Sequence, residues 1–283
     1  IMRNILCVTL IALLGGCTST SITEKYQDKR NDIINVKDKV IEFETGNVLI
    51  GSVSRLYMSN KCLLIADHKS VDKQIHIFNK NDFSYLTSIG NFGEGPEEIT
   101  VMGCLAIDEA HHQLYVSDHA KQKIFSYDMD SVMVDSLYKP QVKTAMNETL
   151  FPSEYQYIND TLSIAVLIKP TSTSTFNQFL GRWNMNTGEM IPMKYTHPDI
   201  QKKRITFAAS EKAGIYVECY TRHDLMTICS LDGELLYNIY GPDWDGGNGN
   251  KLQSFGTVMI GNDKIFVSYY GEDYTRDSFP TKI

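Results

Sequence analysis

Apolar and polar residues alternate in short runs along most of the chain, and this alternation predicts β-strands. Residues 62–68 form an apolar run that ends in an Asp-His pair, and an alternating run over residues 75–78 follows after a short polar turn. The same order returns over residues 113–127, again with an Asp-His pair. Successive side chains of a strand point to opposite faces, so a period of two indicates antiparallel strands.

Tight turns recur at nearly even spacing. Five of them precede the first apolar strand of a unit, and their starts are 51, 48, 54 and 49 residues apart. They are Asn60-Lys61, His111-His112, Asn159-Asp160, Ala213-Gly214 and Asn262-Asp263. A second series, rich in Asn, Asp and Gly, lies at residues 79–82, 128–131, 184–188 and 231–233. Two independent series with one period indicate a structural repeat of about fifty residues.

A repeat of this length holds three or four short strands, and one small sheet cannot bury both of its faces alone. Radial stacking of the sheets solves this, so the sequence predicts an all-β fold, a β-propeller of four-stranded antiparallel blades. Strands after the second turns are expected over residues 83–89, 132–137, 189–193 and 234–240. No long window has helical spacing, although residues 197–204 are compatible with one short turn. A sandwich of two sheets is the alternative.

Two parts of the chain carry a family resemblance. The alternating residues 114–118 and 124–128 resemble NHL-type propeller repeats, and residues 88–98 (SIGNFGEGPEE) resemble the glycine-rich blade junction of TolB-like, six-bladed propeller lipoproteins of Bacteroidetes. The resemblance covers most of residues 40–283. It implies six blades in a cell-envelope lipoprotein and implies no catalytic residues.

The last repeat departs from this pattern. Its strands are expected over residues 255–260 and 264–270, and its next strand is due where the sequence stops at Ile283. We therefore expect the propeller to be incomplete at its C-terminus. A strand expected over residues 40–50 would pair with the missing blade in the complete ring, and an unpaired edge of this kind invites aggregation.

The N-terminal residues predict export. Arg3 precedes an apolar run over residues 5–14, which is typical of a secretory signal and too short for a membrane span. The motif Leu14-Gly15-Gly16-Cys17 resembles the lipobox of bacterial lipoproteins and implies a lipid on Cys17 as the first mature residue. An ordinary signal peptide that contains a cysteine is the alternative.

These features divide the chain into three parts. We expect a lipoprotein signal peptide over residues 1–16, a flexible polar tether over residues 17–35 and the propeller over residues 36–283. The mature protein is expected at the bacterial cell envelope, anchored through its lipid to the outer membrane.

The charge balance narrows the partners. The chain has a formal net charge of −7 at pH 7 and no basic cluster. Nucleic acid is therefore excluded as a partner, because its phosphates require Lys and Arg. An anionic membrane surface would attract the chain only through the lipid on Cys17.

Four cysteines lie in the expected propeller, at positions 62, 104, 219 and 229. None belongs to a C-x-x-C pair, so the sequence gives no support for a zinc site. Cys219 and Cys229 are equidistant from Asp224 in a predicted hairpin and are expected to lie opposite each other. Buried free thiols are favoured over a disulfide, because directly opposed strand cysteines rarely have bridging geometry.

The two Asp-His pairs are candidates for metal ligation. Asp67-His68 and Asp118-His119 occupy equivalent positions in two repeats. Equivalent positions on neighbouring blades lie around a ring and need not converge, and an Asp at the end of a strand typically caps the turn. We therefore expect a structural role for both aspartates.

A glycine-rich loop with Gly90, Gly93 and Gly95 is a candidate for phosphate binding. A phosphate loop needs a following helix, whereas Glu97-Glu98 follows here and would repel an anion. Glycine is expected instead to supply the positive φ of a sharp blade crossing.

Two further motifs are weaker. Residues 243–250 (DWDGGNGN) suggest a calcium site, but Gly247 stands where an EF-hand loop needs an oxygen ligand, and Ser254 stands where it needs a glutamate. His111-His112 lies in a turn and is expected to be exposed to solvent.

The sequence assigns no catalytic, cofactor-binding or metal-binding residue, and we expect no enzyme activity. No serine lies in a G-x-S-x-G motif, so a hydrolase triad of that kind has no support. The expected function is a binding or interaction module with an unknown protein or glycan partner. The alternative is a calcium-dependent, lactonase-like propeller hydrolase, which requires Asp, Asn or Glu side chains that meet at the central channel.

Overall fold

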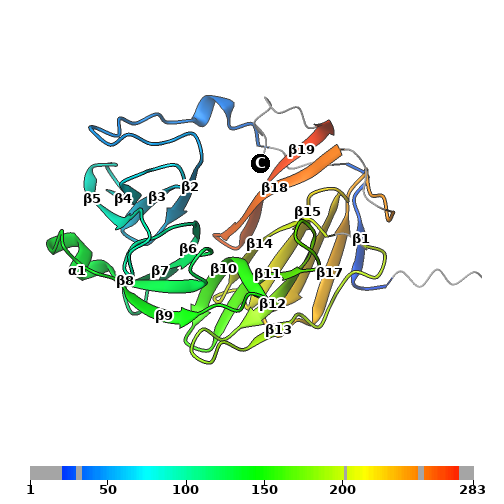
Figure 1. Ribbon diagram of the computed structural model, residues 1–283. Helices are drawn as coiled ribbons and strands as arrows, with labels where there is room; N and C mark the ends of the chain where they lie inside the picture. The colour runs from blue at the N-terminus through cyan, green and yellow to red at the C-terminus, as the bar shows by residue number, and fades with distance from the viewer. Residues whose placement is uncertain (1–20, 30–33, 201–202, 248–251, 274–283) are drawn as a thin grey trace, which may run out of the picture.

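A computed structural model describes residues 21–29, 34–200, 203–247 and 252–273, and its sheets fan out around a common axis (Figure 1). We call the first two sheets blades A and B. Blade A consists of β2 (Ser54–Met58), β3 (Cys62–Asp67), β4 (Lys73–Asn79) and β5 (Tyr85–Asn91). Blade B consists of β6 (Met102–Asp108), β7 (Gln113–Asp118), β8 (Lys123–Asp128) and β9 (Gln141–Ala145). Neighbouring strands in both are antiparallel.

Blades C and D repeat the pattern, and a hairpin follows them. Blade C consists of β10 (Phe151–Asn159), β11 (Leu162–Pro170), β12 (Phe176–Trp183) and β13 (Met190–Pro192). Blade D consists of β14 (Ile205–Ser210), β15 (Ile215–Tyr220), β16 (Leu225–Ser230) and β17 (Leu235–Tyr240). The hairpin consists of β18 (Leu252–Gly261) and β19 (Lys264–Asp273).

The first strands of the sheets lie innermost. Strand β6 contacts β10, and β14 contacts β18, so these strands surround the axis while the later strands of each sheet lie farther out (Figure 1). This arrangement confirms the predicted propeller of four-stranded antiparallel blades and excludes the two-sheet sandwich.

Apolar clusters fill the spaces between successive sheets. In β7, Leu114 and Val116 pack in the cluster between blades A and B, whereas Tyr115 packs in the cluster between blades B and C. Further clusters join blade C to blade D and blade D to the hairpin. Blades B, C and D thus bury both faces against neighbouring sheets, which is the physical reason that the repeat had to stack.

The turns fall where the sequence predicts them. The first series separates β2 from β3, β6 from β7, β10 from β11, β14 from β15, and β18 from β19. Three residues of this series that are not glycine, His112 (φ 52°), Asn262 (φ 49°) and Asp263 (φ 58°), adopt the left-handed conformation of tight turns.

One predicted strand is wrong. Residues 132–137 do not form a strand, because helix α1 (Met129–Val134) replaces its beginning and β9 starts only at Gln141. The carboxylate of Asp128 accepts a hydrogen bond from the amide of Ser131 at 2.7 Å and caps the helix. Val132 is buried between blades A and B, so its apolar character serves a helix rather than a strand.

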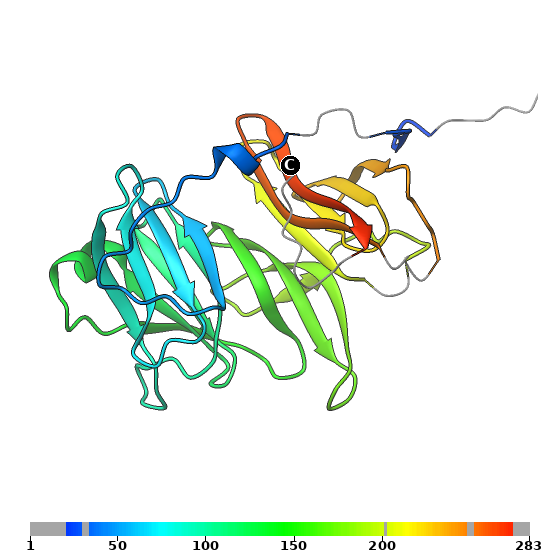
Figure 2. The same cartoon turned by 90° about the horizontal axis from the view of Figure 1, so that it is seen from above.

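The strand predicted over residues 40–50 is also wrong. This segment has no strand and runs as a strap beside blade A (Figure 2). Its Phe43 and Ile50 pack on Leu63 and Phe78, which face away from blade B. The strap therefore covers the face of blade A that no neighbouring blade covers in the described structure. The short turn expected over residues 197–204 is present at residues 198–199, where the Ile200 amide donates to the His197 carbonyl at 3.4 Å.

Part of the predicted tether is ordered. Strand β1 (Glu24–Tyr26) pairs in parallel with β17, so the expectation of a flexible tether is wrong at these residues. The Glu24 carboxylate accepts hydrogen bonds from the Tyr240 hydroxyl and from Asn238 Nδ2 at 3.1 Å, and Tyr26 stacks on Tyr240 with ring centroids 4.6 Å apart. The outer edge of blade D thereby gains a fifth strand.

The predicted hairpin of Cys219 and Cys229 has a different register. Cys219 lies opposite Met226, and Cys229 lies opposite Tyr216, because the turn is centred about one and a half residues earlier than Asp224. The two thiols are therefore not opposed. The four described cysteines are buried thiols and are not joined in disulfides, as expected.

The predicted signal peptide and the predicted lipid site at Cys17 lie outside the described residues. Among the residues that are described, no helix is long and apolar enough to cross a bilayer.

Candidate functional site

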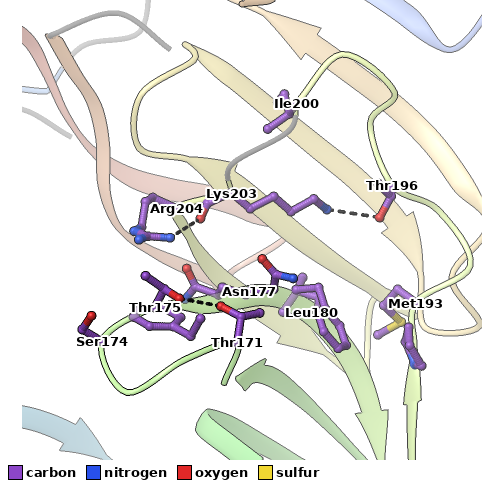
Figure 3. Close-up of a pocket in the computed structure, with 14 residues that line it drawn as sticks. Thr171, Ser174, Thr175, Asn177, Leu180, Met193, Thr196, Ile200, Lys203 and Arg204 are labelled. Atoms are coloured by element: carbon purple, nitrogen blue, oxygen red, sulfur yellow. Dashed lines mark hydrogen bonds between the residues drawn. The ribbon is translucent and has the colours of Figure 1, made fainter. Parts of the chain in front are cut away.

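A polar groove lies between blades C and D (Figure 3). Its volume is about 690 Å³, and its walls come from the loop and strand that follow β11 and from the segment that joins β13 to β14. The lining residues are mostly hydroxyl, amide, aromatic and cationic: Thr171, Ser174, Thr175, Phe176, Asn177, Gln178, Phe179, Leu180, Pro192, Met193, Thr196, Ile200, Lys203 and Arg204. None of them is acidic.

Hydrogen bonds within the β11–β12 loop hold one wall of the groove. The Thr171 amide donates to the Thr175 carbonyl at 2.9 Å, and the two threonine hydroxyls are 2.7 Å apart. The hydroxyl of Ser172 also lies 2.7 Å from that of Thr175. The loop therefore presents hydroxyl groups from a constrained backbone.

Lys203 is a buried cation in the opposite wall. Its Nζ lies 3.2 Å from Glu218 Oε1 and 3.2 Å from Thr196 Oγ1. Burial raises the pKa of Glu218, while the adjacent ammonium of Lys203 opposes that shift. The Lys203 charge is thus already balanced within blade D, and its role is structural.

Arg204 is the cation that faces the groove (Figure 3). Its guanidinium carbon lies 5.0 Å from the Phe176 ring centroid, and its Nη1 donates to the Lys203 carbonyl at 2.9 Å. No carboxylate of the described residues forms an ion pair with it. A planar guanidinium fixed in this way can bind a carboxylate through two parallel hydrogen bonds.

The aspartates of the Asp-His pairs cap turns, as predicted. The buried Asp118 carboxylate accepts hydrogen bonds from the amides of Thr100 (2.8 Å), Val101 (3.2 Å), Ala120 (3.0 Å) and Lys121 (3.1 Å). Asp67 accepts from two amides in the same way, those of Gly51 and Lys69. Each aspartate therefore fixes the segment that leads into its blade.

The histidines of these pairs are partly buried. His68 Nδ1 lies 3.1 Å from the Met102 carbonyl, and the His119 ring packs edge-on against Phe151. Burial lowers the pKa of both imidazoles, and it also lowers the pKa of the buried His76. The folded state therefore favours the neutral forms of these imidazoles.

These shifts predict a loss of stability in mild acid. Between the lowered folded-state pKa of His76 and its unfolded value of about 6.5, the unfolded chain binds more protons, so the free energy of unfolding falls as the pH falls. We expect urea midpoints to decrease from pH 7.5 to pH 5.5. The variant His76→Gln should lose part of that dependence, and a variant with the full wild-type slope would contradict the assignment.

The glycine-rich loop is a structural turn, as predicted. Lys121 Nζ donates to the carbonyls of Gly93 (3.2 Å), Gly95 (2.6 Å) and Glu98 (2.6 Å). Gly90 has a φ of 73°, which only glycine adopts readily. A loop whose carbonyls already surround an ammonium group offers no cradle for phosphate.

The other motifs have local partners. In the part of residues 243–250 that is described, the Asp245 carboxylate accepts the amide of Gly247 at 2.9 Å. His111 and His112 are exposed, as expected, but each pairs with an aspartate: His111 with Asp108 at 2.8 Å, and His112 with Asp130 at 2.7 Å.

The inner strands bear on the lactonase-like alternative. Glu154 of β10 forms an ion pair with Arg55 of β2, with Nη1 and Oε1 2.8 Å apart. Among the described residues, the only group of three potential ligand side chains is Asp108, His111 and Asp160, which lies at the last residue of β6 and in the turns that follow β6 and β10. No observation therefore favours calcium-dependent hydrolysis at the channel.

Sequence reasoning missed the groove. The run of hydroxyl residues over 171–175 between two strands was a signal of a polar loop, and Phe176-Asn177-Gln178 continues it. Nothing in the sequence brings Arg204 to that loop, because the contact arises only when blades C and D stack.

Four-stranded antiparallel sheets arranged around a common axis define a β-propeller. A family model described as DUF5128, six-bladed β-propeller, matches residues 19–180, and the chain belongs to this family. The finer likeness to TolB-like and NHL-type propellers stays a prediction. No curated protein sequence matches the chain.

A solved structure shares the fold at low identity. A Bacteroides fragilis protein described as a candidate exported protein is 14% identical, with a TM-score of 0.54 over 89% of this chain and 75% of its own. A DUF4221 member from Bacteroides vulgatus is 10% identical, with a TM-score of 0.49 over 64% of this chain. The match spans 56% of the length of the B. vulgatus protein.

Proposed function

We propose that the protein is a binding module of the bacterial cell envelope and that its ligand occupies the groove between blades C and D. The carrying observation is Arg204, an exposed guanidinium in a groove that contains no acidic lining residue. The groove volume of about 690 Å³ lies within the range of small-ligand sites.

The lining chemistry favours an acidic oligosaccharide. Hydroxyl and amide side chains such as Thr171, Asn177 and Gln178 complement sugar hydroxyls, and Phe179 offers an apolar surface beside them. Arg204 adds a partner for a carboxylate, because charge-assisted bidentate pairs are among the strongest hydrogen bonds. A uronic acid polymer satisfies both requirements.

Equilibrium binding of oligogalacturonate tests this assignment. We expect the full chain, purified in detergent, to bind oligogalacturonate and to bind its neutral methyl ester more weakly. Arg204→Gln should weaken oligogalacturonate binding about 10- to 100-fold, because hydrogen bonds to charged groups contribute about 1.5–3 kcal/mol.

Arg182→Gln is the matched control. Arg182 lies in β12 of blade C, outside the groove, and forms an ion pair with Asp232 at 3.2 Å. The Arg182→Gln variant should bind oligogalacturonate as tightly as the wild type does. Equal affinity for the acid and its ester, or an unchanged affinity of Arg204→Gln, would contradict the proposal.

A lipid on Cys17 would place this groove at a membrane. Cys17 precedes Glu24 by seven positions, a span of at most about 25 Å when fully extended. Because β1 docks on β17, the outer edge of blade D would then lie near the lipid surface. The bilayer is thus the second proposed partner, reached through the lipid.

A further inference from the structure

A cluster of three side chains of the types that bind metal ions lies where blades B and C meet. Asp108 ends β6, His111 follows it in the turn to β7, and Asp160 lies in the turn between β10 and β11. One ligand atom from each, two carboxylate oxygens and an imidazole nitrogen, lies within 4.8 Å of the other two. The residues come from two blades, so their meeting is a product of the stacking.

Both carboxylates are held in place. Asp108 is buried, and its oxygens accept hydrogen bonds from the His111 amide at 3.1 Å and from the Tyr115 hydroxyl at 3.4 Å. Asp160 Oδ1 accepts from the Tyr157 hydroxyl at 2.7 Å. The three side chains border a cavity of about 430 Å³, and His111 and Asp160 are exposed, so an ion can enter from solvent.

At two other contacts between neighbouring sheets on this side of the molecule, each carboxylate has a hydrogen-bond donor or a cation as its partner. Glu109 of blade B accepts the Asn60 amide of blade A at 2.7 Å, and Lys212 of blade D lies 4.0 Å from Asp263 of the hairpin. Between blades B and C two carboxylates face a single imidazole. No lysine or arginine of the described residues forms an ion pair with either of them.

We propose that Asp108, His111 and Asp160 bind a divalent cation of the Zn²⁺ type that links blade B to blade C. An imidazole nitrogen combined with two carboxylate oxygens suits zinc, whereas calcium and magnesium prefer sites made of oxygen alone. Three protein ligands leave a fourth tetrahedral position open. On binding, His111 Nδ1 exchanges its contact with Asp108 for a bond to the metal. This site is separate from the groove and does not depend on the proposed function.

Calorimetric titration with ZnCl₂ alone tests the site. The full chain, without a histidine tag, should bind one Zn²⁺ with saturation and should bind CaCl₂ at least about tenfold more weakly. Asp160→Asn and His111→Gln should each weaken Zn²⁺ binding about tenfold or more, since even outer-shell changes cost 10–100-fold. Both side chains are exposed, so these variants should fold.

His112→Gln is the matched control, because His112 lies in the same turn and pairs with one carboxylate only. It should bind Zn²⁺ as the wild type does. Zinc should also raise the thermal midpoint of the wild type and of this control, and raise it less in Asp160→Asn. Absence of binding up to 1 mM ZnCl₂, equal affinity in all variants, or tighter binding of calcium would overturn the proposal.

Discussion

Replacement of Asp118 by alanine should lower the free energy of unfolding by about 3–5 kcal/mol, the range seen when one partner of a buried charged network is removed. The carboxylate accepts four backbone amides and lies 3.9 Å from the Lys121 ammonium. Alanine would leave these donors without an acceptor, and unsatisfied buried donors are costly.

Urea denaturation followed by circular dichroism measures this effect. Asp118→Asn should lose less stability than Asp118→Ala. The asparagine oxygen can still accept hydrogen bonds from the backbone amides, although its NH₂ group faces other donors. Asp130→Ala is the control, since Asp130 is exposed and contacts only His112. Equal midpoints for Asp118→Ala and Asp130→Ala would show that the Asp-His motif does not fix the blade.

Trp183→Ala should cost about 3–5 kcal/mol, as large-to-small changes of buried tryptophan do. Trp183 is fully buried in the cluster between blades B and C and meets Tyr155 edge-on, with ring centroids 5.2 Å apart. The cavity would weaken the contact of two whole sheets, because each sheet depends on its neighbours for burial.

The same denaturation experiment tests whether the loss of stability comes from the cavity that alanine leaves at position 183. Trp183→Phe should lose clearly less than Trp183→Ala, since it keeps most of the aromatic volume. Leu137→Ala should change the midpoint little, because Leu137 is 83% exposed. A small loss for Trp183→Ala would mean that the interface between blades B and C contributes little to stability.

Local sequence patterns predicted most of the strands of the fold. The first turn series placed β3, β7, β11, β15 and β19, because tight turns favour Asn, Asp and Gly for local conformational reasons. The Asp118 cap was predictable for the same reason, since its partners lie within about twenty residues.

Features made by tertiary contact were not predictable. Strand β1 has three residues and no alternation. It forms because it pairs with the edge of β17, where the Asn238 and Tyr240 side chains donate hydrogen bonds to Glu24. Residues 40–50 alternate like a strand but cover blade A, since the apolar pattern records burial and not hydrogen bonding.

The candidate site shows the same limit. The hydroxyl-rich loop over residues 171–175 is visible in the sequence, but Arg204 is not marked by any motif. The sequence predicts His111 and Asp160 only as turn residues about fifty positions apart, and no motif marks Asp108 beside them. A repeat predicts that blades stack, but it does not predict which loops meet.

Hydrogen exchange with and without oligogalacturonate tests the location of the binding site most directly. The account predicts slower exchange at the amides of residues 171–179 and 193–200, which border the groove, and unchanged exchange along β2, β6 and β10. Protection confined to those inner strands, or no protection at saturating ligand, would contradict a groove between blades C and D as the binding site.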